Sequence, residues 1–168
     1  MTITIRPESE ADLDAIWLLT KAAFDGRPYA GGDEQDLVNS LRACGGLYVS
    51  LVATDGDEIV GQITFSPATI SSNVGNWFAL GPVSVIPARQ GEGIGAMLID
   101  AGMKVITEQG AWGCILTGNP LYYSRHGFEP AAEHCPDNEP KEYFMLRRVG
   151  EAKPVGQFAF HEAFYADI

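Results

Sequence analysis

A glycine-rich turn between a β-branched run and an apolar helical pattern is the stretch best suited to chemistry. It reads Gln90-Gly91-Glu92-Gly93-Ile94-Gly95 and follows a run that begins at Val83. Glycine has no Cβ, so a backbone there can come close to a ligand. The free N–H groups and the dipole of the helix that opens behind the turn favour an anion such as phosphate. We interpret the turn as a pyrophosphate-binding site.

Two common kinds of phosphate-binding turn do not fit this stretch. A nucleotide P-loop carries Lys and then Ser or Thr after its second glycine, and neither residue is found there. A dinucleotide-binding turn carries a third glycine where this chain has Leu98. It also needs an acid about twenty residues further on, where this chain has Ile115.

A second segment of interest lies downstream, beyond an apolar strand, and reads Asn119-Pro120-Leu121-Tyr122-Tyr123-Ser124-Arg125-His126-Gly127-Phe128. Glycine turns and Gly-Phe pairs are each common, but the two motifs in this order are specific. Together with Leu98, they resemble the signatures of the GCN5-related N-acetyltransferases (GNAT family). The resemblance covers most of residues 1–148, and the Asn-Pro-x-Tyr-Tyr variant resembles a subgroup of predicted bacterial enzymes with unassigned acceptors.

The resemblance implies both a fold and an activity. The fold is α/β (α+β), with a mixed, mostly antiparallel sheet that is flanked by helices and whose fourth and fifth strands splay apart. The activity is the transfer of an acetyl group from acetyl-CoA to a primary amine, by direct attack in a ternary complex. The acceptor, a small molecule or a protein amino group, stays open, and we expect the stretch from Gly26 to Gly32 to help select it.

The resemblance also implies which residues hold the cofactor. The backbone of the fourth strand would bond the acyl end of the cofactor, through Val83, Ser84 and Val85. The pyrophosphate and its surroundings would be held by Gln90, Gly91, Glu92, Gly93, Ile94, Gly95, Ala96 and Asn119. Arg89 could pair with a phosphate or stay an exposed loop residue.

The family carries a tyrosine four residues before a Gly-Phe pair. Tyr123 lies four residues before Gly127-Phe128 and matches this tyrosine. Its phenol keeps its proton at neutral pH and could pass it to the departing sulfur. The alternative is that Tyr123 only packs, as most buried tyrosines do. Tyr122 competes for the role, but neighbouring helical positions point about 100° apart, so one of the two faces the thiol.

The residue that takes the proton from the amine is less clear. Many relatives carry a Glu on the fourth strand, where this chain has Phe78, Ala79 and Leu80. Glu34 is the predicted substitute and Asp33 is another candidate. Either acid could instead only stabilise the start of a helix, and the amine could also arrive neutral.

Length and charge limit the remaining possibilities. The chain has 168 residues, of which 46% are hydrophobic, and a formal net charge of −11. We expect one domain over 1–168, with 149–168 as an extension or last strand. The charge disfavours nucleic acid and mainly aids solubility. No run is long enough for a membrane span and no signal-peptide pattern is present, so we expect a cytoplasmic protein that could form a homodimer.

The cysteines and histidines predict neither disulfides nor a metal site, because their spacings are wide and irregular. They are Cys44, Cys114, Cys135, His126, His134 and His161. Two rival functions stay open: an acyl-CoA-binding module without catalysis, and a thiol hydrolase that uses Cys114. The hydrolase is disfavoured because a thiol in an apolar strand is inert.

Periodicity and turn residues give the expected elements. Strands are expected at 2–6, 47–54, 59–65 with an extension to 71, 77–86, 112–117 and 143–148. Helices are expected at 13–24, near 33 for about ten residues, at 93–109 and briefly around 122–123. Residues 55–58 should form a tight turn. Gly81-Pro82 predicts a bulge, because proline donates no N–H to a ladder.

Overall fold

The computed structural model describes residues 2–27 and 34–165. Its strands are β1 (Ile3–Pro7), β2 (Val49–Asp55), β3 (Glu58–Ile70), β4 (Trp77–Val85), β5 (Gly113–Thr117), β6 (Glu129–Pro130), β7 (Phe144–Arg148) and β8 (Phe158–Ala159). Its α-helices are α1 (Leu13–Phe24), α2 (Glu34–Ala43), α3 (Ile94–Glu108) and α4 (Pro120–Tyr123). Short 3₁₀ turns include η2 (Pro87–Arg89), η5 (Lys141–Tyr143) and η6 (Glu162–Tyr165).

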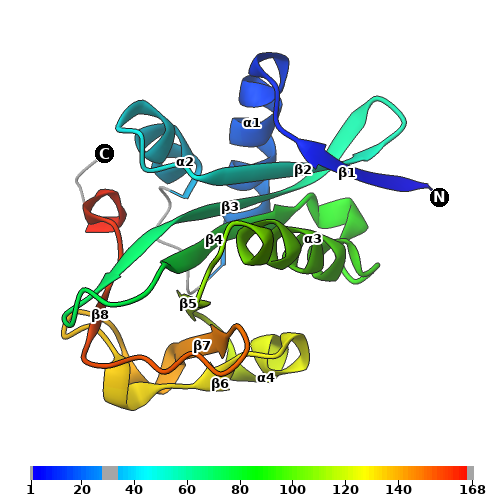
Figure 1. The fold of residues 1–168 in the computed structure, drawn as a ribbon. Coiled ribbons are helices and arrows are strands. Elements are labelled where there is room, and N and C mark those ends of the chain that lie inside the picture. Colours follow the sequence, from blue (N-terminus) through cyan, green and yellow to red (C-terminus); the bar gives the residue numbers. More distant parts are fainter. Residues whose placement is uncertain (1, 28–33, 166–168) are drawn as a thin grey trace.

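The eight strands form one sheet in the order β1-β2-β3-β4-β5-β7-β6, with β8 beside β3. The β4–β5 pair is parallel and the other pairs are antiparallel. Helices cover both faces: α1 and α2 lie on one side and α3 on the other (Figure 1). This is the mixed, mostly antiparallel sheet flanked by helices that the sequence resemblance predicted.

The sheet opens between β4 and β5. The two strands pair only from Trp77 to Ala79 on one side and from Gly113 to Ile115 on the other. Beyond these residues β4 continues to Val85 without pairing to β5. The predicted splay of the fourth and fifth strands is confirmed.

A bulge interrupts β4 where the sequence predicted one. The β3–β4 register shifts between Ile63 and Phe65, opposite Gly81-Pro82, and the peptide bond between these two residues is cis. Beyond the bulge, Val83, Ser84 and Val85 face Ile63, Gln62 and Gly61 of β3. The bulge therefore separates the part of β4 that pairs with β5 from the part that does not.

The main core lies between α3 and the sheet. Apolar residues recur along one stripe of α3, as expected for a helix that packs on a sheet. The stripe comprises Ile94, Leu98, Ile99, Met103 and Ile106, all at most 3% exposed. A second cluster lies on the opposite face and joins β4, β5 and β7 to the tail through Trp77, Ile115, Phe144 and Phe158.

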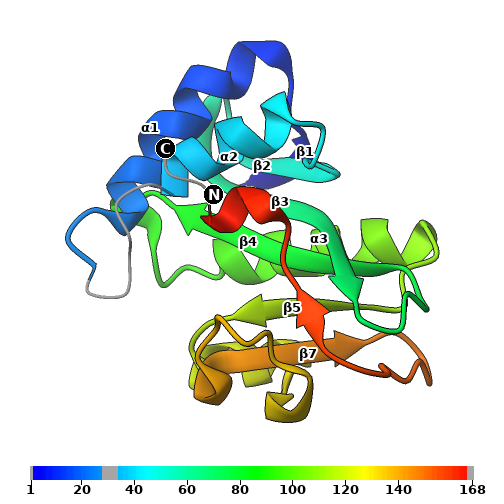
Figure 2. The same cartoon turned by 90° about the vertical axis from the view of Figure 1, so that its left-hand side faces the viewer.

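The C-terminal segment contributes a short last strand and then the 3₁₀ turn η6. It pairs with the end of β3 through Phe158 and Ala159. It then crosses β5 and β7 on the face opposite α3 and ends in η6 beside α2 (Figure 2). This tail covers the part of the sheet next to the opening.

Candidate active site

The glycine-rich turn presents a set of backbone donors at the start of α3. Gly91 and Gly93 have φ of +84° and +87°, which side chains with a Cβ rarely adopt. Gly93 is also the N-cap of α3. Within the described part of the chain, the amides of residues 91–96 donate to no protein oxygen. Unpaired amides at a helix start fit an anion such as a diphosphate.

Gln90, the first residue of this turn, is hydrogen-bonded to the end of β4. Its Nε2 donates to the Val85 carbonyl over 3.0 Å, and its Oε1 accepts from Arg27 Nη2 over 2.6 Å. The side chain therefore joins the turn to β4 and to the end of α1. Gln90 acts on the turn's position, whether or not it also touches a ligand.

Arg89 is engaged by two carboxylates. Its Nη1 lies 2.9 Å from Asp55 Oδ2 and its Nε lies 3.1 Å from Glu92 Oε1. These bonds hold the turn against the hairpin between β2 and β3, and they raise the pKa of the Arg89 guanidinium. They also offset the negative charge of Glu92, which would otherwise repel a phosphate beside the turn.

The free edge of β4 faces the opening through Val83 and Val85. Ile86 N donates to Val60 O over 2.9 Å, which makes this pair a hydrogen-bonded one. Such pairs alternate along an antiparallel ladder, so the backbone of Ser84 is turned toward β3. The backbone groups of Val83 and Val85 are turned away from β3, toward the opening. The Ser84 hydroxyl lies 3.3 Å from Thr20 Oγ1 of α1.

The two tyrosines of α4 take different places. Tyr122 Oη lies 2.9 Å from where a Cβ on Gly95 would be, so it fills the space above the first turn of α3. The Tyr123 ring lies against Gly118, and its Cε2 is 2.6 Å from an ideal Cβ there. Burial raises the pKa of Tyr122, which stays protonated at neutral pH. Tyr123 as proton donor stays a prediction.

Asn119 has a structural function at this point. Its Oδ1 accepts a hydrogen bond from Leu121 N over 3.0 Å and thereby caps α4. Its predicted contact with the cofactor stays a prediction. Ile94 is 1% exposed, so its side chain belongs to the core and only its amide is offered to a ligand.

The predicted proton acceptors are only partly described. Glu34 is the first residue of α2 and is half-buried. Asp33 and most of the Gly26–Gly32 stretch lie outside the described residues. At the end of β5, Thr117 and Tyr165 both donate hydrogen bonds to the Glu139 carboxylate. The sequence did not reveal this cluster.

The other candidate groups have ordinary structural surroundings. Cys114 is fully buried, and burial raises the pKa of its thiol far above the usual value, which makes it inert. His126 packs on the Tyr122 ring with centroids 4.8 Å apart. No cluster of metal-binding side chains is found among the described residues. Those residues also include no helix with the length and hydrophobicity to span a membrane.

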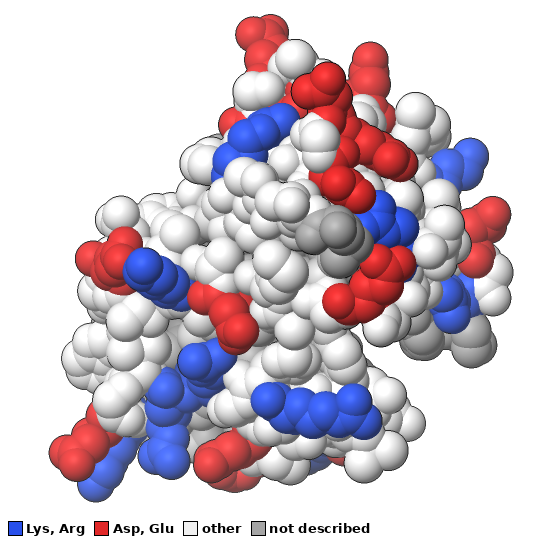
Figure 3. Space-filling view, turned by 90° about the vertical axis from the view of Figure 1, so that its right-hand side faces the viewer, with Lys and Arg blue, Asp and Glu red and all other residues white. Residues whose placement is uncertain are grey.

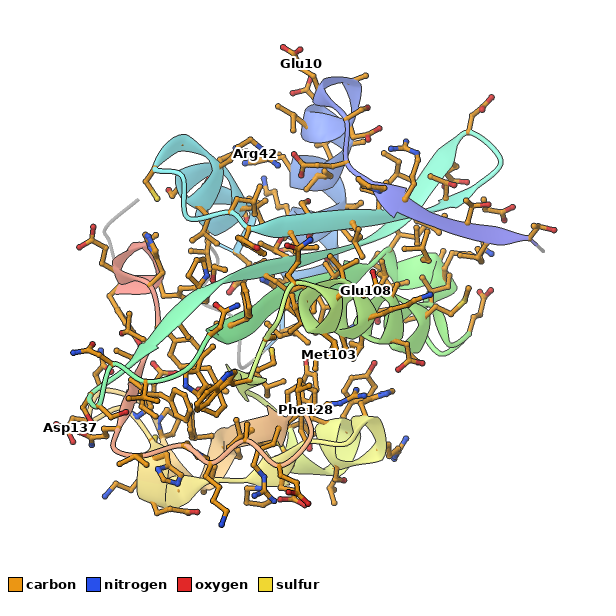
Figure 4. The ribbon with its side chains drawn as sticks, in the orientation of Figure 1. Glu10, Arg42, Met103, Glu108, Phe128 and Asp137 are labelled. Atoms are coloured by element: carbon orange, nitrogen blue, oxygen red, sulfur yellow. The ribbon has the colours of Figure 1, made fainter. Side chains whose placement is uncertain are left out.

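The surface is indented on the side of the molecule where α3 begins. In the view of Figure 3 the indentation lies between the upper and the lower part of the molecule. Met103 of α3 and Phe128, which precedes β6, point toward each other and belong to the same core cluster (Figure 4).

A parallel strand pair that opens beside an anion-binding helix start is the arrangement expected of an acyl-CoA-dependent acyltransferase. Residues 46–130 match the family model of the acetyltransferase (GNAT) domain. The chain is 30% identical over 167 residues to the uncharacterized N-acetyltransferase YhbS of Escherichia coli K12, which covers 95% of this chain and 97% of that protein. The chain belongs to the GNAT family.

Solved structures agree with this assignment. A GNAT family acetyltransferase from Brucella melitensis in complex with acetyl-CoA is 40% identical, with a TM-score of 0.86 over 97% of this chain and 98% of that one. YhbS of Escherichia coli in complex with CoA is 29% identical, with a TM-score of 0.88 over 98% and 92% of the two chains. The sequence prediction of the family and its fold is confirmed.

Proposed function

We propose that this protein transfers an acetyl group from acetyl-CoA to a primary amine by direct attack in a ternary complex. The observation that carries the proposal is the opening between β4 and β5, which lies next to a turn whose amides have no acceptor among the described residues. Two similar structures contain acetyl-CoA or CoA, which supports the same ligand here.

Different residues would bind the diphosphate and the acyl arm of the cofactor. The amides of residues 91–96 would bind the diphosphate, and Arg89 would keep Glu92 from repelling it. The backbone groups of Val83 and the amide of Val85, whose carbonyl accepts from Gln90, would align the acyl arm along β4. Bound acetyl-CoA supplies a thioester, whose carbonyl carbon the amine attacks. Holding the two reactants together removes most of the entropic cost of this step.

Two proton movements complete the transfer. As the C–N bond forms and the C–S bond breaks, the sulfur gains a proton and the nitrogen loses one. Tyr123 is the proposed donor to the sulfur, because a phenol stays protonated at neutral pH. Glu34 is the acceptor that the sequence predicts. We also propose that residues 1–168 act as one domain.

The test is a screen of primary amines with acetyl-CoA, followed by the loss of thioester absorbance and by the mass of the product. A thiol reagent is unsuitable, because Cys44 is exposed and would react. We expect one or more amines to gain an acetyl group. Calorimetric binding of acetyl-CoA without transfer to any amine would instead favour the non-catalytic module, for which the residues Phe78, Ala79 and Leu80 on β4 are the supporting observation.

A further inference from the structure

Three segments that are far apart in the sequence meet at the carboxylate of Glu139. Thr117 Oγ1, at the end of β5, donates to Glu139 Oε1 over 2.7 Å. Tyr165 Oη, in η6 of the tail, donates to Glu139 Oε2 over 3.1 Å. Glu139 itself belongs to the connection before η5 and is half-buried. Two donors thus fix the position of one acidic side chain.

This carboxylate stands beside the open part of the sheet. The last residue pair between β4 and β5 is Ala79 with Ile115, and Thr117 lies two residues beyond it. Side chains alternate along a strand, so Thr117 points to the same face as Ile115. Ile115 packs with the tail cluster, whereas Cys114 and Leu116 pack on the α3 side. Glu139 therefore lies on the face opposite α3.

The figures support this placement. The tail crosses the face opposite α3 and brings η6 to the side of α2 (Figure 2). Asp137, two residues before Glu139, lies on the side of β8 and away from α3 (Figure 4). The glycine-rich turn and the start of α3 lie on the other side of the sheet. A cofactor bound at the turn would therefore lie on the side of the sheet away from Glu139.

The residue after Thr117, Gly118, lies against a tyrosine on the other face of the sheet. Gly118 supports the Tyr123 ring, and Tyr123 packs with the cluster on the α3 side. The end of β5 therefore has a phenol on one side and a carboxylate on the other. An acetyl transfer to an amine needs a proton donor toward the sulfur and a proton acceptor toward the nitrogen.

We propose that Glu139 is the proton acceptor for the amine, which enters from the face opposite α3. This inference rests on the acetyltransferase activity proposed above. The nitrogen attacks the thioester carbon, the C–N bond forms and the C–S bond breaks. The nitrogen becomes acidic as it is acylated and gives its proton to a Glu139 oxygen, while the sulfur takes a proton from Tyr123.

The bonding of Glu139 suits this role. Each carboxylate oxygen can accept two hydrogen bonds, and Thr117 and Tyr165 use one on each oxygen. Among the contacts of the described residues, this leaves one acceptor position per oxygen for the amine. The charged residues within three positions of Glu139 are Asp137 in the connection before η5 and Lys141 and Glu142 in η5. Burial and the neighbouring Glu139 raise the pKa of Tyr165, so its phenol remains a donor over the whole working pH range.

The experiment compares Glu139→Gln with Glu142→Gln, which makes the same charge change at an exposed position of η5. The substrate is an amine that the wild-type protein acetylates. We expect Glu139→Gln to lower kcat/KM by about 100-fold, the size of a general-base contribution. The loss should shrink at high pH, where hydroxide can take the proton. The affinity of Glu139→Gln for CoA should stay at the wild-type value. Glu142→Gln should keep the wild-type rate.

The outcomes separate this inference from the function on which it rests. If the wild type transfers acetyl to no amine, both fail. If the wild type is active and Glu139→Gln keeps its rate and pH profile, only the role of Glu139 is refuted. A large loss in Glu34→Gln without one in Glu139→Gln would assign the proton to Glu34.

Tyr165→Phe keeps the test informative if Glu139→Gln does not fold. This variant retains the carboxylate but removes one of the two donors that fix its position. We expect kcat/KM to fall while the affinity for CoA stays at the wild-type value. A residue that only tethers the tail would lower the melting temperature and leave kcat/KM unchanged, which would overturn the proposal.

Discussion

Gly93 offers the sharpest test of the cofactor site. It has a φ of +87°, caps α3, and has open space where a Cβ would lie. In Gly93→Ala the new methyl group meets no atom, so the effect of the substitution comes from the backbone alone. A residue with a Cβ pays about 1–2 kcal/mol to stay in this left-handed conformation.

The strain of Gly93→Ala lowers either the stability of the fold or the affinity for CoA. If the turn keeps its shape, the free energy of unfolding falls by about 1–2 kcal/mol. If the turn relaxes, its amides no longer converge, and the ligand must restore the strained form when it binds. The dissociation constant of CoA then rises by about 5–30-fold, since 1.4 kcal/mol corresponds to tenfold. We expect the second result, because the amides of this turn have no protein acceptor among the described residues to hold them.

The matched control is Gly110→Ala at the other end of the same helix. Gly110 has a φ of +85° and equally open space around it. Calorimetry with CoA and chemical denaturation should be measured for both variants. Gly110→Ala should lose stability and bind CoA normally. If Gly93→Ala keeps both the wild-type stability and the wild-type affinity for CoA, the turn has relaxed without any effect on the ligand, and residues 90–95 do not form the diphosphate site.

Three further predictions concern single side chains. Tyr123→Phe should lower kcat far more than Tyr122→Phe in a steady-state assay, and the reverse order would assign the proton donor to Tyr122. Cys114→Ser should keep full activity, because the thiol is buried and inert, although a hydroxyl in that apolar site should lower the melting temperature. Arg6 and Ser9 hold the pKa of Asp12 well below its usual range, so Asp12→Asn should cost about 2 kcal/mol at neutral pH. That stabilisation is fully present above the unfolded pKa and is lost as the pH falls through the folded pKa, so urea titrations of wild type and Asp12→Asn should begin to converge below about pH 4.

The sequence predicted well what depends on neighbouring residues. The turn at 90–95, the helix behind it and the hairpin between Asp55 and Glu58 are local patterns, and the structure has each of them. The bulge at Gly81-Pro82 could also be predicted, because proline cannot donate to a ladder. Family resemblance then supplied the mixed, mostly antiparallel sheet with its splayed fourth and fifth strands, which local patterns do not contain.

What the sequence could not reveal depends on contacts between distant segments. Glu139 reaches Thr117 because β7 pairs with β5, and it reaches Tyr165 because the tail folds back over both strands. No spacing in the chain reports such a meeting. Gly95 is a related case: its missing Cβ makes room for the Tyr122 hydroxyl, whereas the sequence attributed this room to a ligand.

The two faces of the central strands differ in a way that supports an acceptor on the side opposite α3. Along β3, Ile63 and Phe65 face α3, whereas Gln62, Thr64 and Ser66 face the other side. Such alternation is typical of a strand with one face in water, yet all three polar residues are 0% exposed. Among the described residues, Gln62 Oε1 and Ser66 Oγ have no hydrogen-bond partner. A buried oxygen without a partner costs about 1–3 kcal/mol, which a purely structural helix contact would avoid by being apolar, as the α3 face is. The polar side of the sheet is thus costly for packing alone, and it is the side on which we place the amine.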